Sequence, residues 1–417
     1  MRTTGTGRNW AGNVTYRAER LVVPGSLDEL AEVITTEPKV RVLGSRHSFN
    51  DLADTTGVLI SLEDLPKAPV ALVDEKVVRV PAATRHGDLV PELDRLGVAI
   101  PNLASLPHIS AGGAIATGTH GSGDGIGTLS TQVAAFDFMA PDGSLRRIAR
   151  GDTDFEGHVV HLGALGVLLT LDLEVEPTYE VSQTVYEGLT WDAALGDYDE
   201  LTRSGDSVSL FTTWGDASRV DQVWVKSRTP RTAPDLSRFG ASPADGPRHP
   251  IPGADPSPAT DQGGVPGPWH ARLPHFRLEF TPSAGAEIQA EYLLPRADLP
   301  AAIAALQPLA DDIARLLHVS ELRTMRADDL WLSPAYGRDT VGIHFTWKDL
   351  PDELYAFLPT LEAALPNSAR PHWGKVTTLP PEEITARYER WPDFARLAGS
   401  LDPERRFVGQ YLERLGL

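Results

Sequence analysis

Short apolar runs alternate with small and polar residues over the first 180 residues, the pattern of short strands joined by turns. Apolar positions with helical spacing follow Ser26, and Ser26 and Glu29 have the spacing of a capping box, so we expect a helix over 27–36. A second helix is expected near 87–96. Runs rich in β-branched residues predict strands at 39–43, 57–62, 77–80, 133–140, 145–148 and 168–175. This mixture of helices and strands indicates an α+β fold.

The pattern changes after Pro177, where longer elements begin. Strands are expected at 221–225 and 287–294, helices near 299–317 and 351–364, and a short helical tail over 381–413. The stretch 229–270 is dense in Pro, Gly, Asp and Ser without periodicity, so we expect a long irregular connection there. A second domain is therefore predicted, and the length of 417 residues agrees, because one hydrophobic core rarely grows that large.

The segment 110–127, SAGGAIATGTHGSGDGIG, holds too many glycines for a regular element and too many apolar residues for a flexible linker. We therefore expect an ordered loop that exposes its backbone. A tight connection between strands and a phosphate-binding loop explain the glycines equally well. The spacing does not match the G-x-G-x-x-G fingerprint, so a dinucleotide fold of that type is not predicted.

Composition narrows the classes of function. The chain is 41% hydrophobic and 23% charged, and no apolar run approaches the roughly 20 residues that span a bilayer. The first residues lack the apolar core of a secretory signal, and the absence of cysteine excludes disulfides, cysteine-based zinc sites and iron–sulfur clusters. A net charge of -19 without a Lys/Arg cluster argues against nucleic acid. We expect a cytoplasmic protein that binds neither membrane nor nucleic acid.

One histidine, His47, stands in the small-residue run Gly44-Ser45-Arg46-His47-Ser48, where the backbone can approach a ligand and the imidazole can face it. Taken alone, a loop histidine is more often a surface or hydrogen-bonding residue. Its spacing to the other histidines predicts no metal site. The neighbouring motifs have to decide between these interpretations.

Three ordered motifs resemble the FAD-binding half of the vanillyl-alcohol oxidase-type flavoenzymes. Four more make the chain similar to the alditol oxidases and the related sugar-lactone oxidases within that superfamily. The first three are VLGSRHSFND, PNLASLPHISAGGAIATGTHGSG and HLGALGVLLTLDLEV, and the others are NWAGN, SELRT, HFTW and RPHWGK. Several motifs in order are far more specific than one glycine loop, and the similarity extends over nearly the whole chain.

The resemblance implies FAD as the cofactor. His47 falls at the position of the histidine that is bonded to the flavin 8α-methyl group, and without cysteine a second, thioether link is impossible. Backbone N–H groups around His47 and in the loop 117–123 would hold the pyrophosphate, which glycine lets them approach closely. Besides His47, the implied cofactor contacts are Gly44, Ser45, Arg46, Ser48, Ala104, Ser105, Thr117, Gly118, Thr119, Gly121, Ser122 and Gly166. No metal ion is implied.

Substrate contacts are implied in the second half of the chain. Glu321 and Arg323 are two residues apart in an expected strand, as are His344 and Thr346, so each pair shares one face. A surface ion pair would explain such spacing, but both pairs coincide with substrate-binding positions of the alditol oxidases. Ser105 is the remaining substrate contact that the resemblance implies. Neutral polyols need paired donors and acceptors of this kind.

Two residues are candidates for the chemical step. Lys375 in HWGK resembles the lysine beside the oxidised carbon, where it would orient the hydroxyl or share its proton. His344 is the favoured base, because an ordinary pKa of about 6.5 suits proton removal at neutral pH, whereas lysine needs strong depression from about 10.4. Gln289 and Glu291 also share a strand face, but an exposed sheet explains them equally well, so they are left outside the predicted site.

The fold implied by the resemblance is a PCMH-type, two-subdomain FAD-binding domain over 1–180 with an α+β substrate-binding cap domain over 181–375. A C-terminal tail, 376–417, would return to the FAD domain. The implied reaction oxidises the terminal C1 hydroxyl of xylitol or sorbitol and reduces O2 to hydrogen peroxide, in a monomer. The alternative is a sugar-1,4-lactone oxidase or dehydrogenase. A non-catalytic flavoprotein or polyol-binding module is a third class, disfavoured because suitable residues occupy every polar position.

Overall fold

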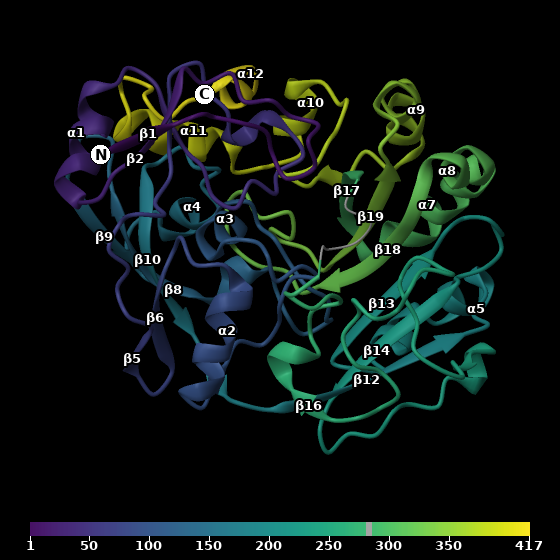
Figure 1. Ribbon diagram of the computed structural model, residues 1–417. Helices are drawn as coiled ribbons and strands as arrows, with labels where there is room; N and C mark the ends of the chain where they lie inside the picture. Colours follow the sequence, from purple (N-terminus) through teal and green to yellow (C-terminus); the bar gives the residue numbers. More distant parts are fainter. Residues whose placement is uncertain (281–285) are drawn as a thin grey trace.

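A computed structural model of the protein describes residues 1–280 and 286–417. The N-terminal half contains two main sheets, on the left of Figure 1. The first sheet is ordered β1 (Arg2–Thr4), β2 (Arg20–Val23), β4 (Val58–Ile60), β3 (Val40–Val42), with β4 parallel to β2 and β3. The second is antiparallel and ordered β5 (Ala71–Asp74), β6 (Val77–Pro81), β10 (Val167–Glu174), β8 (Val133–Met139), β9 (Leu145–Ala149). The short strands β7 (Val98–Ala99) and β11 (Glu176–Pro177) pair separately.

The helix α1 (Leu27–Thr36) has the predicted bounds. Ser26 Oγ accepts a hydrogen bond from the Glu29 backbone N–H at 3.2 Å, as the capping box requires. The Glu29 carboxylate accepts its return bond from the Gly25 N–H at 2.8 Å, one residue before the cap. The predicted helix near 87–96 is confirmed as α2 (His86–Arg95).

The glycine-rich segment differs from the expectation, because part of it is helical. α3 (Ala111–Ala116) begins directly after Ser110, and a second short helix, α4 (Phe155–Val159), follows further along the chain. A Cβ on Gly112 would lie 3.1 Å from both the Cβ and the carbonyl oxygen of Ala82. Glycine is therefore used here for close packing of a helix, a purpose that its low helix propensity conceals.

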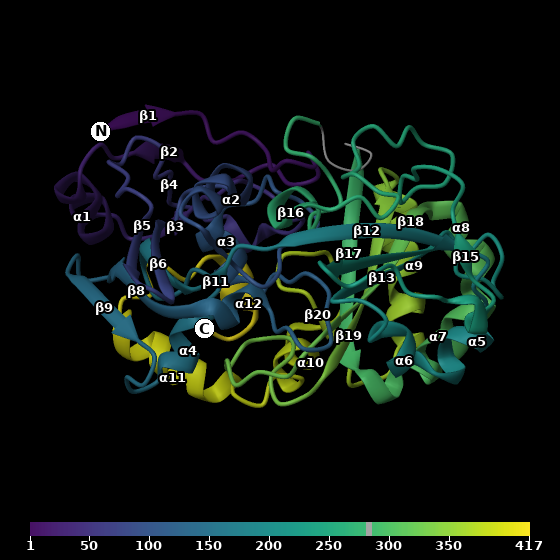
Figure 2. The same ribbon diagram turned by 90° about the horizontal axis from the view of Figure 1, so that it is seen from below.

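A large sheet forms most of the second half, on the right of Figure 1 and beside the N-terminal half in Figure 2. Its order is β15 (Ser242–Pro243), β12 (Glu180–Glu187), β14 (Gln222–Arg228), β13 (Ser207–Thr212), β18 (Leu317–Met325), β19 (Thr340–Lys348), β17 (Glu287–Pro295), β20 (Arg370–Pro371), and β16 (Gly267–Pro268) pairs with β12. The helices around it are α5 (Trp191–Gly196), α6 (Tyr198–Thr202), α7 (Leu299–Leu306), α8 (Ala310–Leu316) and α9 (Pro351–Ala364). The predicted boundaries at 181 and 375 stay predictions.

The central strands of this sheet have two different faces. Ile288, Ala290, Ile343, Phe345 and Leu322 are buried in one apolar cluster with side chains of α7, α8 and α9. Because side chains alternate along a strand, the residues between them point to the opposite face, toward the N-terminal half. The outer helices therefore determine which residues remain for a ligand.

Two predictions about the second half need adjustment. The helix expected over 299–317 is divided into α7 and α8 by a 3-10 turn at Gln307–Leu309, which contains Pro308, and Leu317 already belongs to β18. Proline has no N–H to continue the helix. The expected irregular connection over 229–270 is largely confirmed, since its strands β15 and β16 are two residues long.

The C-terminal tail packs against the N-terminal half, as the yellow and purple ribbons of Figure 1 show. It holds α10 (Pro381–Ala386), α11 (Trp391–Leu401) and α12 (Gln410–Arg414). Phe394 and Leu412 are buried in one cluster with Phe155, and the Val40 N–H donates to the Arg406 carbonyl at 2.8 Å. Among the described residues, no helix combines the length and apolarity needed to cross a bilayer.

Candidate functional site

A cavity of about 620 Å³ separates the glycine-rich loops of the N-terminal half from the inner face of the large sheet. This volume falls within the range of about 300–1,000 Å³ typical of small-molecule sites. The predicted site residues that line it are Gly44, Ser45, Arg46, His47, Ser48, Ala104, Ser105, Thr117, Thr119, Gly166, Glu321, Arg323, His344, Thr346 and Lys375. One cavity therefore brings together residues that lie more than 300 positions apart in the sequence.

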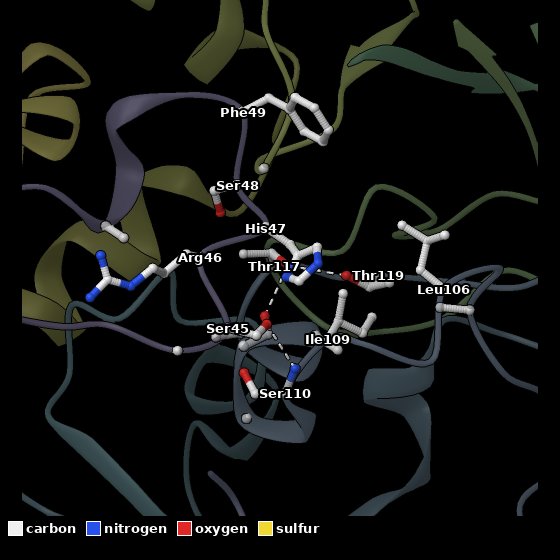
Figure 3. Close-up of a pocket in the computed structure, with 18 of the residues that line it drawn as sticks. Ser45, Arg46, His47, Ser48, Phe49, Leu106, Ile109, Ser110, Thr117 and Thr119 are labelled. Carbon is white, nitrogen blue, oxygen red and sulfur yellow. Dashed lines mark hydrogen bonds between the residues drawn. The ribbon is translucent and has the colours of Figure 1, made fainter. Parts of the chain in front are cut away.

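His47 projects into this cavity beside Thr117 and Thr119, as Figure 3 shows. Its ring stacks on Trp10 with 5.4 Å between centroids and 15° between planes. The Nε2 atom is buried and has no hydrogen-bond partner within the described part of the chain. Burial lowers the pKa of His47 to about 4, so the ring is neutral at ordinary pH. A neutral, oriented imidazole with a free ring nitrogen can act as a nucleophile.

The backbone around His47 closes on α3. A Cβ on Gly44 would lie 2.7 Å from Ser110 Oγ, and the Ser110 N–H donates to Ser45 Oγ at 3.0 Å (Figure 3). Arg46 has a φ of 64° and turns its guanidinium away from the cavity, where it donates to the Thr6 carbonyl at 2.6 Å. The loop therefore offers backbone and small side chains to a ligand.

Three predicted cofactor contacts lie outside the cavity lining. A Cβ on Gly118 would meet Pro334 at 2.8 Å, and one on Gly121 would overlap Asn102. Ser122 Oγ donates to the Val208 carbonyl. These residues therefore pack the loop against its neighbours, which sequence spacing alone cannot distinguish from ligand binding.

Side chains from three adjacent strands form a row across the inner face of the large sheet. His344 of β19 is paired in register with Glu291 of β17 on one side and Glu321 of β18 on the other. The next row pairs Thr346 with Gln289. All of these side chains are buried and line the cavity. Gln289 and Glu291, left outside the predicted site, therefore belong to it.

Arg323 links the sheet to the glycine-rich loops. Its Nη2 donates to Glu291 Oε1 at 3.0 Å, and its Nη1 donates to Ser105 Oγ at 3.2 Å and to the His120 carbonyl at 3.1 Å. A glycine, Gly342, lies beside it in β19, where a Cβ would be 3.3 Å from Glu291 Oε1. The absence of a side chain at Gly342 therefore leaves room for the Glu291 carboxylate that Arg323 binds.

The two carboxylates of the row are held ionised. Burial opposes the charge of Glu321, but Arg323 and the His275 hydrogen bond outweigh it and keep its pKa far below the usual range. Burial likewise opposes the charge of Glu291, while His120 and Arg323 hold its pKa well below the usual range. The inner face therefore presents fixed charges inside a closed site.

Lys375 and His344 share one hydrogen-bond acceptor, the side-chain amide of Gln289. Both donate to Gln289 Oε1, His344 through Nε2 at 3.1 Å, while the Gln289 amide nitrogen donates to Glu287. This orientation places the proton of neutral His344 on Nε2 and leaves the Nδ1 lone pair free. The ring of Phe49 covers the Lys375 ammonium at 4.7 Å. Gln289 is therefore the residue that fixes both candidates.

Burial removes the reason for favouring His344 as the base. It lowers the pKa of His344 to about 3, so the expectation of a value near the ordinary one is wrong. Burial also lowers the pKa of Lys375, to about 8, although Glu291 opposes the shift. A group whose pKa lies near the working pH is the better proton acceptor, and that group is now Lys375.

The cavity fits FAD in three respects. It offers a neutral histidine with an unpartnered ring nitrogen, a glycine-lined turn without room for side chains, and hydroxyls at Ser45, Thr117 and Thr119. His47 and these loops would hold the cofactor. The buried face opposite would hold the molecule on which it acts. This arrangement is that of a flavin-dependent oxidoreductase with a substrate site between two sheets.

Comparisons with known families and structures agree. A family described as FAD binding domain matches residues 18–149, and one described as D-arabinono-1,4-lactone oxidase matches residues 286–415. The chain shares its fold with cholesterol oxidase from B. sterolicum, with a TM-score of 0.75, 14% identity and coverage of 99% of this chain and 97% of that chain. The chain is thus an FAD-dependent oxidoreductase with the α+β fold of the vanillyl-alcohol oxidase type.

The most informative similarity is to an alditol oxidase of a Streptomyces species, 44% identical over 411 residues and covering 98% of both chains. L-gulono-1,4-lactone dehydrogenase of Mycobacterium tuberculosis is 27% identical, covering 98% of both chains. L-gulonolactone oxidase of Mus musculus is 24% identical, covering 98% of this chain and 97% of its own. The chain belongs to the alditol oxidase family.

Proposed function

We propose that this protein oxidises the terminal hydroxyl of an alditol, such as xylitol or sorbitol, to the aldose, with O2 reduced to hydrogen peroxide. The observation that carries the proposal is the buried row Glu291, His344 and Glu321, which lies with Arg323 and Lys375 opposite His47. A neutral polyol supplies a hydroxyl on every carbon and no charge. A face of fixed acceptors and donors is suited to that pattern.

Lys375 is the proposed proton acceptor, and His344 is its partner in holding the hydroxyl. The neutral amine would take the hydroxyl proton while Gln289 keeps its nitrogen oriented. The free Nδ1 of His344 would accept a hydrogen bond from the same or the adjacent hydroxyl. FAD, when bound, supplies the acceptor for the hydride from the alcohol carbon and passes the electrons to oxygen.

Ser105, Glu321 and Thr346 are proposed to bind the rest of the chain. Ser105 Oγ already accepts from Arg323, so its own hydrogen remains available for a substrate oxygen. Binding at several points along an extended chain would fix which carbon reacts. We also propose that FAD is bonded covalently to His47, which its free ring nitrogen and neutral state support.

Anaerobic mixing of the purified protein with alditols and with sugar-1,4-lactones, followed by flavin absorbance, tests this proposal. We expect xylitol and sorbitol to bleach the flavin faster than any lactone, and oxygen to restore the colour with one hydrogen peroxide per turnover. The family match over 286–415 favours lactones as the second candidate. Faster bleaching by lactones than by alditols, or a reduced flavin that dyes reoxidise and oxygen does not, would refute the proposed alditol oxidase activity.

A further inference from the structure

A buried lysine, Lys226, lies on a strand outside the cavity lining. Lys226 of β14 is 1% exposed, and within residues 1–280 and 286–417 it forms no ion pair. Its ammonium donates to the carbonyls of Leu273 and Pro274 and to His275 Nδ1 at 3.1 Å. Burying an ammonium is costly unless its hydrogen bonds are satisfied, and here all three N–H donors have acceptors. Lys226 therefore holds the segment 273–275 in place.

His275 connects this lysine to the site. Its Nε2 lies 2.7 Å from Glu321 Oε1, and its ring is held edge-on by Phe211 at 5.4 Å and by Trp224 at 5.3 Å. Because an ammonium can only donate, Nδ1 of His275 accepts, and the ring proton is on Nε2. If the proton moved from Lys226 to His275, Nε2 would still carry a hydrogen. As long as the Lys226–His275 pair keeps the proton of the ammonium, Glu321 therefore receives an N–H from this side.

This contact determines what Glu321 can offer a substrate. Oε1 is occupied by His275 and lies 3.6 Å from Arg323 Nε, whereas Oε2 receives no hydrogen bond from the described residues. The other charged or titratable groups that act on this carboxylate are His344, across the strand pair, and the two lysines Lys375 and Lys226. Burial lowers the pKa of Lys226 to about 7 and that of His275 to about 4. Lys226 does not line the cavity, so it acts on a bound substrate only through His275 and Glu321.

We propose that Lys226 and His275 are positioning residues that hold Glu321 ionised, with Oε2 turned to the cavity as the acceptor for a substrate hydroxyl away from the reacting carbon. This inference rests on the proposed function. A fixed carboxylate accepts hydrogen bonds and rejects other acceptors, so the pair selects substrates with a hydroxyl at one defined position. Its loss weakens recognition of that hydroxyl and leaves the chemical step at Lys375 nearly unchanged.

The test compares four variants of the full FAD-loaded chain. His275→Leu removes both hydrogen bonds, Lys226→Met removes the lysine, and His275→Gln keeps one donor and one acceptor. His249→Leu is the control, because His249 is also buried and packs on Phe276 at 5.4 Å without touching Glu321. Anaerobic flavin reduction over a range of xylitol concentrations gives the limiting rate and the half-saturating concentration separately.

For His275→Leu we expect the half-saturating concentration to rise about 10- to 100-fold, as for a lost hydrogen bond to a charged group, with the limiting rate within about threefold of wild type. Lys226→Met should raise it about tenfold, and His275→Gln by less than Lys226→Met. Among the 2-, 3- and 4-deoxy analogues of xylitol, one should bind poorly to the wild type. Its disadvantage relative to xylitol should shrink about tenfold in His275→Leu.

Three results would overturn the proposal. The limiting rate of His275→Leu could fall by as large a factor as its half-saturating concentration rises, or His249→Leu could show the same rise in half-saturating concentration. The third is a half-saturating concentration for His275→Gln as high as that for His275→Leu. If His275→Leu is not recovered as folded flavoprotein, Lys226→Met with the deoxy analogues decides by the same criteria. If the wild type is reduced by lactones and by no alditol, the proposed function fails. The same variants measured with the lactone then decide separately whether the pair positions Glu321.

Discussion

The two walls of the cavity differ in what they offer a ligand. Around His47 the wall consists of backbone and short side chains such as Gly44 and Ser45, closely packed against α3. Opposite, on the large sheet, the wall consists of buried charges, among them Glu321 and Arg323. The short, uncharged side chains of the first wall can be removed without leaving a charge buried. In the second wall, removing Arg323 leaves its partner carboxylates Glu291 and Glu321 buried without it, which is strongly destabilising.

The largest effect is expected at Lys375, the proposed proton acceptor of the charged wall. Lys375→Met should reduce the rate of flavin reduction by xylitol by about 10²- to 10⁴-fold. In the wild type only the neutral amine accepts a proton, so the rate should rise about tenfold per pH unit below its pKa. It should level above about 8, the value to which burial lowers the pKa of Lys375. Stopped-flow absorbance across this pH range measures both changes.

Lys348→Met is the matched control. Lys348 is the last residue of β19, and its ammonium donates to the Arg315 carbonyl on the surface. It should keep the wild-type rate and pH profile. Burial lowers the pKa of His344 to about 3, so a rate controlled by His344 would be flat across neutral pH. A profile that survives Lys375→Met and disappears in His344→Ala would return the role of base to His344.

The second effect concerns stability and tests the cost of an unpaired buried charge. Arg323→Met leaves Glu291 and Glu321 without their arginine, so the free energy of unfolding should fall by about 3–5 kcal/mol. The additional change Glu291→Gln should restore part of it. Arg396→Met removes an exposed arginine from its ion pair with Asp393, and it should lower the free energy of unfolding by less than about 1 kcal/mol. Urea unfolding followed by tryptophan fluorescence measures these differences, and equal losses in the two single variants would contradict the comparison.

The sequence predicts the backbone wall better than the charged wall. Helix α1 and the strands beside it follow from capping and apolar patterns, and the motifs around His47 identify the cofactor. Gln289 and Glu291 have the same alternation in an exposed sheet as in a buried one, so only the packing of α7, α8 and α9 on the other face reveals their burial. The distinction requires knowing which face the helices cover.

Burial is also the reason that Lys375, and not His344, is the proposed proton acceptor. The ordinary pKa of a residue type applies to a side chain in water, and here both groups lie in a closed site where the charged form is disfavoured. The split of the helix expected over 299–317 has a local cause in Pro308, so this difference could be predicted from the sequence. His275 and Lys226 carry no local signal at all.

The smallest effect on stability is expected at His47, within the backbone wall. The unpartnered Nε2 of His47 means that His47→Ala should change the free energy of unfolding by less than about 1 kcal/mol, and the flavin should still bind through the surrounding loops. Acid precipitation should leave FAD attached to the wild type and release it from His47→Ala. His108→Ala, which removes the neighbouring ring 6.5 Å away, is the control and should retain the attached flavin. Release from all three proteins would show that no covalent bond exists, and a purified His47→Ala without any FAD would show that the histidine, and not the backbone, holds the cofactor.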